Sequence, residues 1–534
     1  MKNDSTSTIG ISAKSFFSGT LLSRISGMAR DVIMASIFGI TPSVAAFMLA
    51  FRFSNLLRRL LGDGAMQGAF IPHFERIRQK DSKGAAAFFR NVSASLSISL
   101  IAIIAIMECL LLISLWFFHP SLENKDVIIM TALMMPGLFF ICLYGLNTSF
   151  LQCERVYFIP SMAPFVFNCI WIVAVVVMRN YAVDDAMIRL SIIVVVAFAG
   201  QWLVTVPVTL LKLRKYINKE WFIQTTCFSK TMLPMIKALF LGIIGVAAAQ
   251  INNGLDAIFA RAASIEGPTF LWYSLRLQQL PLALFGIAIT GALLPPMARA
   301  IKANEIDRYR KFLDFGLRRS MSTMFLATLA IIVTGVSAVN LIYGHGSFTV
   351  EDTIVTARCL FAYSLGLMPI TCVILFSSAF YAFKNYKTPM QLTLVAVLIN
   401  ILLNIFFVFF LRLGTVSIAI ATSISAWINA LLLGFFLLKK HGTFINRKSI
   451  SSIFSVFITG CIAAFVVTLS SYYCSWGTSW IDLLRLTDVI LPRSFSAQSF
   501  VFLFDIIVFI IVAVTVAMII KVRDILDLIR LFFK

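Results

Sequence analysis

Long apolar runs alternate with short polar loops along the whole chain. About 14 such runs occur, and most are near the ~20 residues that a helix needs to cross the hydrocarbon layer of a membrane. Their approximate bounds are 12–39, 44–62, 91–118, 127–151, 159–178, 187–211, 231–260, 269–296, 317–343, 353–382, 389–411, 415–438, 450–473 and 498–520. The pattern predicts an all-α polytopic membrane protein with about 14 transmembrane helices.

The composition agrees with a membrane class and excludes several others. The 534 residues are 60% hydrophobic and 13% charged, whereas soluble proteins carry about 25% charged residues. The nine cysteines and four histidines are scattered, and no nucleotide-binding or hydrolase motif occurs. We therefore expect a protein that is not an enzyme and that holds no metal and no cofactor.

Basic residues concentrate in every second loop between the apolar runs. Roughly 30 of them fall on one side of the membrane and about eight on the other, and cytoplasmic loops carry the excess of Lys and Arg. The basic loops contain Arg76, Arg78, Lys80, Lys83, Lys212, Arg214, Lys215, Lys219, Arg299, Lys302, Arg308, Arg310, Lys311, Lys439, Lys440, Arg447 and Lys448. We therefore expect both termini in the cytoplasm. Because the net charge of +21 is distributed along the membrane surface, no nucleic-acid partner is expected.

Three short motifs recur at a common spacing of about 225 residues, or six predicted helices. The pairs are Gly68–Pro72 with Gly291–Pro295, Asp31–Ala35 with Asp256–Ala260, and Arg155–Tyr157 with Lys384–Tyr386. An even number of helices per repeat gives both halves the same orientation, as in parallel-repeat transporters, whose substrate sites lie near the membrane midplane. We expect two six-helix lobes around a central cleft and a separate pair, helices 13 and 14. The predicted bounds are 1–228 for the N-lobe, 229–444 for the C-lobe and 445–534 for the pair.

Charged residues and amides interrupt four of the predicted helices. A charge at the centre of a bilayer costs about 2.5–3.5 kcal/mol, so such residues are rare unless they are used. They are Arg24, Arg30 and Asp31 in helix 1, Arg52, Asn55, Arg58 and Arg59 in helix 2, Lys237, Asn252, Asn253 and Asp256 in helix 7, and Arg276 in helix 8. Arg24 and Asp31 are two turns apart and share a helix face. The repeat aligns Arg276 with Arg52 to within one position, so we expect cations of both lobes to face one cleft.

Some of these charged residues also have a purely structural explanation, which needs no substrate. Arg58, Arg59 and Lys237 lie near predicted helix ends, where long basic side chains extend to the membrane interface. Arg30 and Asp31 are adjacent, and they can neutralise each other. These alternatives stay open beside the functional one.

The two arginines placed deepest in their spans, Arg24 and Arg276, are the strongest functional candidates. A guanidinium group is always protonated and binds phosphate oxygens bidentately. A proton pump would favour carboxylates and histidines instead. The excess of arginine over acid therefore indicates an anionic substrate, and diphosphate is the best match.

The residues around these charges resemble the MurJ/MviN-type lipid II flippases of the MOP exporter superfamily. The similar segments are Ser23–Asp31, Asn55–Arg59, Gly64–Ala65, Ala69–Pro72, Tyr273–Leu277, Leu294–Pro295 and Tyr343–Thr349. The resemblance implies a 14-helix flippase of the bacterial cytoplasmic (inner) membrane. Such a protein moves lipid II, the undecaprenyl-diphosphate-linked disaccharide-pentapeptide precursor of peptidoglycan, to the outer leaflet by alternating access.

The resemblance also implies roles for individual residues and partners. It assigns substrate binding to Arg24, Arg30, Arg58 and Arg276. Secondary candidates are Ser23, Asp31, Arg52, Asn55, Arg59, Asn252 and Asp256. Helices 13 and 14 are expected to form a groove for the lipid tail. The expected partners are lipid II, membrane lipids and other cell-wall synthesis proteins.

Four positions depart from the family pattern. Ala45 and Leu275 stand where the family usually has Asp, Ser54 where it has Pro, and Asp63 where it has Glu. The two lost Asp residues weaken the acidic half of the site and any cation coupling through it. The arginines are unaffected.

Two other functions remain open at this point. A flippase for another polyprenyl-diphosphate oligosaccharide would use the same arginines. A multidrug/cation antiporter of the same superfamily would need acidic residues in the N-lobe cleft, where Asp31 is the one strong candidate.

Overall fold

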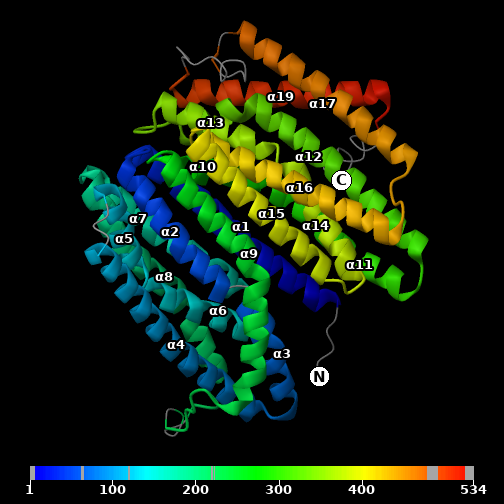
Figure 1. The fold of residues 1–534 in the computed structure, drawn as a ribbon. Coiled ribbons are helices and arrows are strands. Elements are labelled where there is room, and N and C mark those ends of the chain that lie inside the picture. The colour runs from blue at the N-terminus through cyan, green and yellow to red at the C-terminus, as the bar shows by residue number, and fades with distance from the viewer. Residues whose placement is uncertain are drawn as a thin grey trace. The chain divides into compact units, whose positions relative to one another are not determined.

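The computed structural model describes residues 6–61, 65–117, 121–217, 221, 223–474, 476–477 and 491–522. Within these ranges the chain is helical, with short turns and no strand. The helices form two compact units, Met1–Ala257 and Ile258–Lys534, whose elements are labelled in Figure 1. The predicted lobe bounds of 1–228, 229–444 and 445–534 stay a prediction.

Most helices of the first unit are long and lie side by side. In chain order they are α1 (Thr6–Phe38), α2 (Pro42–Leu61), α3 (Ala65–Lys80), α4 (Ser82–Phe117), α5 (Leu122–Met134), α6 (Gly137–Cys153), α7 (Phe158–Val177), α8 (Val183–Leu213) and α9 (Leu233–Ala263). Helix α9 crosses the boundary between Ala257 and Ile258 and ends in the second unit. The pairs α1 with α7, α7 with α8, and α2 with α5 pack against each other.

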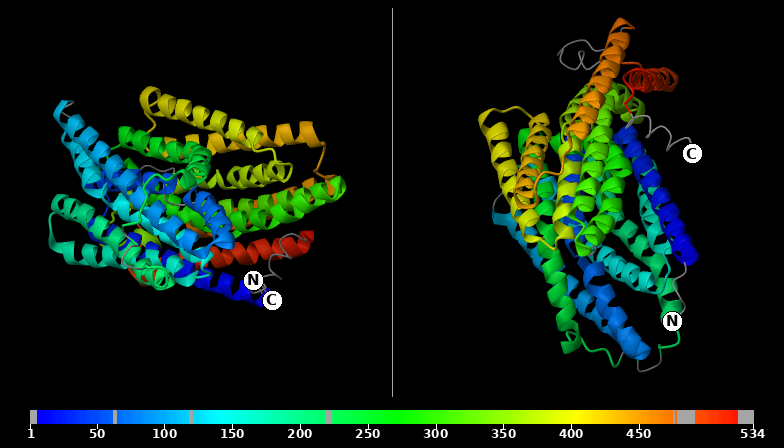
Figure 2. Two further views of the ribbon diagram at one scale, coloured as in Figure 1. Left: turned by 90° about the horizontal axis from the view of Figure 1, so that it is seen from below. Right: turned by 90° about the vertical axis from the view of Figure 1, so that its right-hand side faces the viewer.

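The second unit has the same all-helical construction. Its elements are α10 (Gly267–Pro281), a π-helical turn (Leu282–Ile287), α11 (Ala288–Lys302), α12 (Ile306–Tyr343), α13 (Val350–Ser364), α14 (Leu367–Ala382), α15 (Lys387–Ile405), α16 (Val416–His441), α17 (Arg447–Tyr473) and α19 (Phe495–Ile520). Helices α17 and α19 pack against each other and against α12. The long course of α12, and of α4 in the first unit, can be followed in Figure 2.

The helices reproduce the predicted spans. Ten helical segments are long and apolar enough to cross a membrane, or up to 11 if the bent pair α5 and α6 counts as one span. That pair bends by 44° at Pro136, which lacks a backbone N–H and interrupts a helix. The charged helices α1, α2 and α9 supply the remaining predicted spans. The prediction of an all-α polytopic membrane protein is confirmed.

Helix α3 differs from the sequence prediction, which places residues 65–80 in a basic loop. Its apolar residues Met66, Ala69, Phe70 and Phe74 recur at helical spacing and are buried. They belong to an aromatic core shared with α4 and α6. The basic residues Arg78 and Lys80 lie in the last turn of the helix, after this apolar stripe, so charge alone concealed the stripe.

One turn of the first unit recurs in the second. Arg155 between α6 and α7 and Lys384 between α14 and α15 have positive φ angles of 60° and 58°. The residue after each donates its N–H to a carbonyl five residues earlier, Val156 to Leu151 over 2.8 Å and Asn385 to Phe380 over 3.1 Å. The sequence motif shared by these segments therefore encodes the same helix ending in both units.

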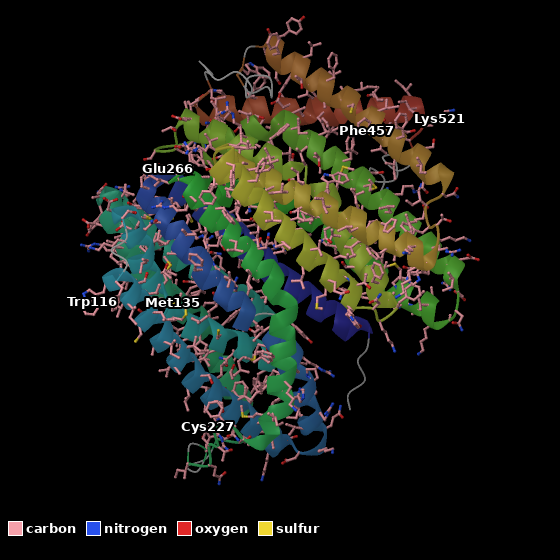
Figure 3. All side chains as sticks on the ribbon, viewed as in Figure 1. Trp116, Met135, Cys227, Glu266, Phe457 and Lys521 are labelled. Carbon is pink, nitrogen blue, oxygen red and sulfur yellow. The ribbon has the colours of Figure 1, made fainter. Side chains whose placement is uncertain are left out.

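Many exposed side chains on the described helices are large and apolar. Trp116 on α4 and Phe457 on α17 are large exposed side chains of this kind, and both are labelled in Figure 3. Such side chains are suited to contact with lipid chains, because exposing an apolar side chain to lipid has no free-energy cost.

Candidate functional site

Arg30 lies in a buried polar network between α1 and α7. Its Nη2 and Nε donate to Oδ1 of Asp31 over 2.7 and 3.0 Å, and its Nη1 donates to Oδ1 of Asn168 over 3.2 Å. Asn168 Nδ2 donates to Ser26 Oγ over 2.9 Å and to the Ser23 carbonyl over 3.2 Å. Arg30 is only 4% exposed and Asp31 only 2%. A buried ion pair needs such complementary bonds, so this network holds α1 against α7.

Aromatic rings enclose the same guanidinium group. Its carbon lies 4.5 Å from the ring centroid of Trp171, 5.9 Å from that of Phe51 and 6.0 Å from that of Phe167. The ring faces attract a cation, and they exclude water from it. Arg30 is thus a fixed positive charge inside the first unit.

Arg24 has a different environment from Arg30. It is exposed, and it lines a cavity of about 340 Å³ within the first unit. The other lining residues are Thr20, Ser23, Gln67, Tyr144, Thr148, Gln152, Tyr157, Pro160, Ser161 and Pro164. Ser23 is a predicted secondary candidate, and the cavity places it beside Arg24.

The cavity wall has hydrogen-bonding capacity that the protein itself does not use. Thr148 is only 7% exposed, and its hydroxyl has no hydrogen-bond partner among the residues that the structure describes. Tyr144, by contrast, donates its hydroxyl to the Pro160 carbonyl over 2.7 Å. A buried polar group without a partner is costly, so Thr148 fits a site that receives a polar ligand next to the Arg24 cation.

Arg58 and Arg59 lie in the last turn of α2, whereas Arg52 lies near the middle of that helix. Arg58 Nε donates to Asn55 Oδ1 over 3.1 Å, one turn earlier. Arg59 is exposed and Arg52 is half-buried. Asn55 therefore orients the Arg58 guanidinium group, and both residues are on the list of predicted candidates.

The polar residues of α9 form a pair on one helix face. Asn252 Nδ2 lies 3.4 Å from Asp256 Oδ2, one turn apart, and Asp256 is buried. Gly254 lies against α2, where an added Cβ would come within 2.8 Å of Leu56 Cδ1. The absence of a side chain at Gly254 thus lets α9 approach α2 closely.

Arg276 belongs to α10 of the second unit. Its guanidinium carbon lies 4.9 Å from the ring centroid of Trp272. The neighbouring Tyr273 is fully buried, and its ring centroid is 4.7 Å from that of Tyr343. The predicted convergence of Arg276 with the arginines of the first unit stays a prediction.

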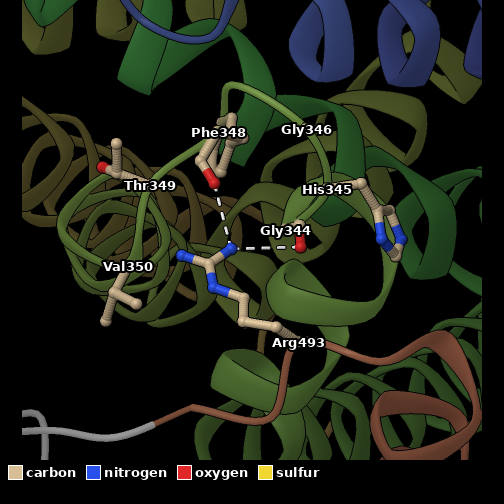
Figure 4. Close-up of a pocket in the computed structure, with 7 residues that line it drawn as sticks. All are labelled: Gly344, His345, Gly346, Phe348, Thr349, Val350 and Arg493. Carbon is tan, nitrogen blue, oxygen red and sulfur yellow. Dashed lines mark hydrogen bonds between the residues drawn. The ribbon is translucent and has the colours of Figure 1, made fainter.

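A second cavity, of about 500 Å³, lies at the loop between α12 and α13. It is lined by Gly344, His345, Gly346, Phe348, Thr349, Val350 and Arg493, which Figure 4 shows. Arg493 Nη1 donates to the carbonyls of Gly344 and Phe348 over 3.1 and 3.0 Å. The segment before α19 is therefore tied to the Tyr343–Thr349 loop, one of the segments on which the family resemblance rests.

Two residues of the Arg30 network were missed from the sequence. Asn168 and Trp171 lie in the apolar run 159–178, and an amide inside such a run was the available signal. Their role depends on which face of α7 meets α1, and that contact is long-range. Thr148 was missed for the same reason.

The helices and these sites define a class, that of multi-pass membrane transporters with cationic side chains inside their apolar helices. A family model described as lipid II flippase MurJ matches residues 34–485. The chain therefore belongs to the MurJ family of lipid II flippases, as the resemblance indicated.

Relatives and solved structures agree with this assignment. The chain is 31% identical to a probable lipid II flippase MurJ of Chlamydia muridarum, covering 99% of this chain and 97% of that one. It is 30% identical to the protein of the same description from Chlamydia trachomatis, over 99% and 97%. A solved lipid II flippase MurJ in an inward closed conformation matches with TM-score 0.75 and 25% identity, over 96% and 99%. An inward-facing multidrug MATE transporter matches with TM-score 0.65 and 12% identity, over 79% and 95%, and it shares the fold alone.

Proposed function

We propose that this protein moves lipid II from the inner to the outer leaflet of the bacterial cytoplasmic membrane by alternating access. Membership of the MurJ family supports this substrate. The observation that carries the mechanism is the Arg24 cation on the wall of a polar cavity within apolar helices. A diphosphate is the part of lipid II that such a cation binds.

The four predicted arginines have different roles in this proposal. Arg24 contacts the diphosphate directly, because its side chain is exposed to the cavity. Arg30 has Asp31 and Asn168 as hydrogen-bond acceptors, so it acts as a positioning residue and holds α1 in place. Arg58 and Arg276 are proposed as further diphosphate-binding residues because the family resemblance assigns that role to them. Each direct contact contributes roughly 1.5–3 kcal/mol, as expected for a hydrogen bond to a charged group.

The proposed orientation places both termini in the cytoplasm. The bias of Lys and Arg toward alternate loops supports it. The basic end of α3 and the basic N-terminal part of α12 would then lie at the cytoplasmic surface. Lipid II synthesised inside the cell would enter the protein from that side, and cell-wall synthesis proteins are candidate partners there.

The proposed role of α17 and α19 is to shape a lateral groove for the polyprenyl chain. Their exposed apolar residues, such as Phe465 and Ile511, support it, because a polyprenyl chain needs an apolar surface. Deleting residues 445–534 should leave a protein that inserts but does not transport. Complementation by the truncated protein would reduce the helix pair to an accessory role.

A transport assay with defined substrates tests the proposed function. The protein is reconstituted into vesicles, and movement of lipid II between leaflets is followed beside that of a polyprenyl-diphosphate oligosaccharide without the pentapeptide. Faster movement of lipid II, lost in Arg24→Ala at equal protein content, is the expected result. Equal rates for both lipids would indicate a broader polyprenyl-diphosphate flippase, and export of an organic cation would indicate an antiporter.

A further inference from the structure

Hydrogen bonds between buried polar side chains join α19 to α12 and α17 in the second unit. Asp505 lies in the middle of α19 and is 0% exposed. The rest of this helix is strongly apolar, from Phe495 to Ile520. A carboxyl group inside a membrane span is costly and therefore marks a functional position by default.

Helices α12 and α17, which pack against α19, each supply one hydroxyl group to this carboxyl group. Ser337 Oγ of α12 lies 3.0 Å from Asp505 Oδ2, and Ser471 Oγ of α17 lies 2.8 Å from Oδ1. Both serines are buried. Asp505 is thus the point at which three helices meet through hydrogen bonds.

Ser337 lies within hydrogen-bond distance of two oxygen atoms, but its hydroxyl group carries one hydrogen. Ser337 Oγ also lies 3.0 Å from the Thr334 carbonyl oxygen, and a serine hydroxyl has only one hydrogen to donate. If Asp505 is ionised, Ser337 must donate to Oδ2 and cannot also bond Thr334. If Oδ2 carries a proton, Asp505 donates to Ser337, and Ser337 donates to Thr334. The protonated carboxyl group therefore satisfies every short contact at once.

The surroundings of the cluster offer the ionised form no counter-charge among the described residues. On α17, residues 449–474 contain no Asp, Glu, Lys, Arg or His, and their titratable groups are Cys461, Tyr472, Tyr473 and Cys474. On α19, Asp505 is the one charged residue between 495 and 520, and Arg493 and Lys521 flank the helix about 18 and 24 Å away along its axis.

The charges of α12 are distant as well. They end at Arg319, which precedes Ser337 by about 27 Å of helix. Tyr343 at the end of α12 and His345 just after it are the titratable groups nearest to this end, and His345 Nε2 is 2.8 Å from the Leu341 carbonyl oxygen of α12. The charged residues of this helix are Asp307, Arg308, Arg310, Lys311, Asp314, Arg318 and Arg319.

We propose that Asp505, Ser337 and Ser471 form a proton-binding site inside the second unit. A proton taken from water binds Oδ2 of the carboxylate and is donated to Ser337, while Ser471 donates to Oδ1. The bound proton links α19 to α12 and α17. Its release leaves a buried carboxylate without a counter-charge, which favours separation of α19 from α12 and entry of water. This site is independent of the substrate that the protein moves.

Infrared spectroscopy of the full-length protein in lipid nanodiscs tests the site. At neutral pH the wild-type protein should show a carboxylic-acid C=O band that is missing in Asp505→Asn, whose amide can still donate to Ser337. Ser337→Ala should shift this band, because it removes the acceptor of the proton. Ser470→Ala is the matched control and should leave the band unchanged, since within the described part of the chain Ser470 bonds the Val467 carbonyl of its own helix and not Asp505. Identical carboxylic-acid regions in wild type and Asp505→Asn, with a carboxylate band lost instead, would overturn the proposal.

Thermal unfolding gives a second readout that does not depend on spectral assignment. The folded protein holds a proton at Asp505 that the unfolded chain releases at neutral pH. The stability that this proton contributes is therefore present at low pH and falls as pH rises. The unfolding temperature of the wild type should therefore decrease with pH more steeply than that of Asp505→Asn. Equal slopes for the two proteins would contradict a proton bound at this position.

Discussion

The guanidinium group of Arg30 lies over the indole ring of Trp171, with 4.5 Å between its carbon atom and the ring centroid. This contact, together with the ion pair to Asp31, removes Arg30 from water. Arg24, six residues earlier on the same helix, lines a polar cavity instead. Two arginines of α1 that look equivalent in sequence therefore have different environments, and we propose that Arg30 holds the helix while Arg24 binds the substrate.

The first prediction concerns the stability that depends on Arg30. Arg30→Ala leaves Asp31 buried without its partner, and breaking a buried pair costs about 3–5 kcal/mol. The variant should show a lower unfolding temperature and a lower yield of folded protein. The double variant Arg30→Leu, Asp31→Leu removes both charges and should recover part of the loss. A stable Arg30→Ala protein would show that the pair does not hold α1.

The second prediction concerns Arg24 as the direct contact. Arg24→Ala should unfold at the wild-type temperature but bind lipid II about 10–100-fold more weakly, since ~1.4 kcal/mol corresponds to a factor of ten. Arg24→Lys should recover only part of the affinity, because lysine keeps the charge and loses the planar fork. Binding and unfolding are measured on the same purified samples. Equal affinity of the lysine and arginine proteins would mean that charge alone is needed.

The third prediction concerns the unpartnered hydroxyl of Thr148. Thr148→Val is nearly isosteric and removes a buried hydroxyl that makes no bond, so stability should be unchanged or higher. Transport should fall by up to about tenfold if the hydroxyl bonds the substrate. The matched control is Thr205→Val, because Thr205 accepts from Asn147 over 3.1 Å and donates to the Trp202 carbonyl. That control should lose stability. Full transport by Thr148→Val would remove Thr148 from the site.

The fourth prediction uses two native cysteines to test the orientation. Cys227 precedes α9 and Cys474 follows α17, and both are exposed. In the proposed orientation an impermeant thiol reagent labels Cys474 in intact cells, and it labels Cys227 only after the cells are permeabilised. The variants Cys227→Ser and Cys474→Ser assign the signals. Labelling of Cys227 from outside would reverse the topology.

Much of the fold follows from sequence because span length and charge placement are local properties. The predicted run 498–520 coincides with most of α19, and the motifs at Arg155 and Lys384 coincide with equivalent turns. Helix α3 was missed because its basic residues concealed a narrow apolar stripe. The sequence therefore predicts a helix well when apolar residues dominate it, and less well when charged residues are mixed with them.

The site was predictable only in part. The charges of α1 predicted a functional site on this helix, which stays a prediction. Of the alternatives for Arg30 and Asp31, the structure shows the ion pair between the two neighbouring residues. The partners Asn168 and Trp171 come from α7, and sequence periodicity does not specify which helices meet. Asp505 could have been noticed as a lone intramembrane carboxyl group, but its two serine partners follow only from the packing of α12 and α17.

Complementation with a direct readout of lipid II tests the central claim most directly. A bacterium depleted of its own lipid II flippase expresses this protein, and the fraction of lipid II exposed at the outer surface of the cytoplasmic membrane is measured. The wild-type chain should restore that fraction and growth, and the double variant Arg24→Ala, Arg276→Ala should restore neither at equal expression. Failure of the wild-type chain to expose lipid II, or full exposure by the double variant, would contradict the account.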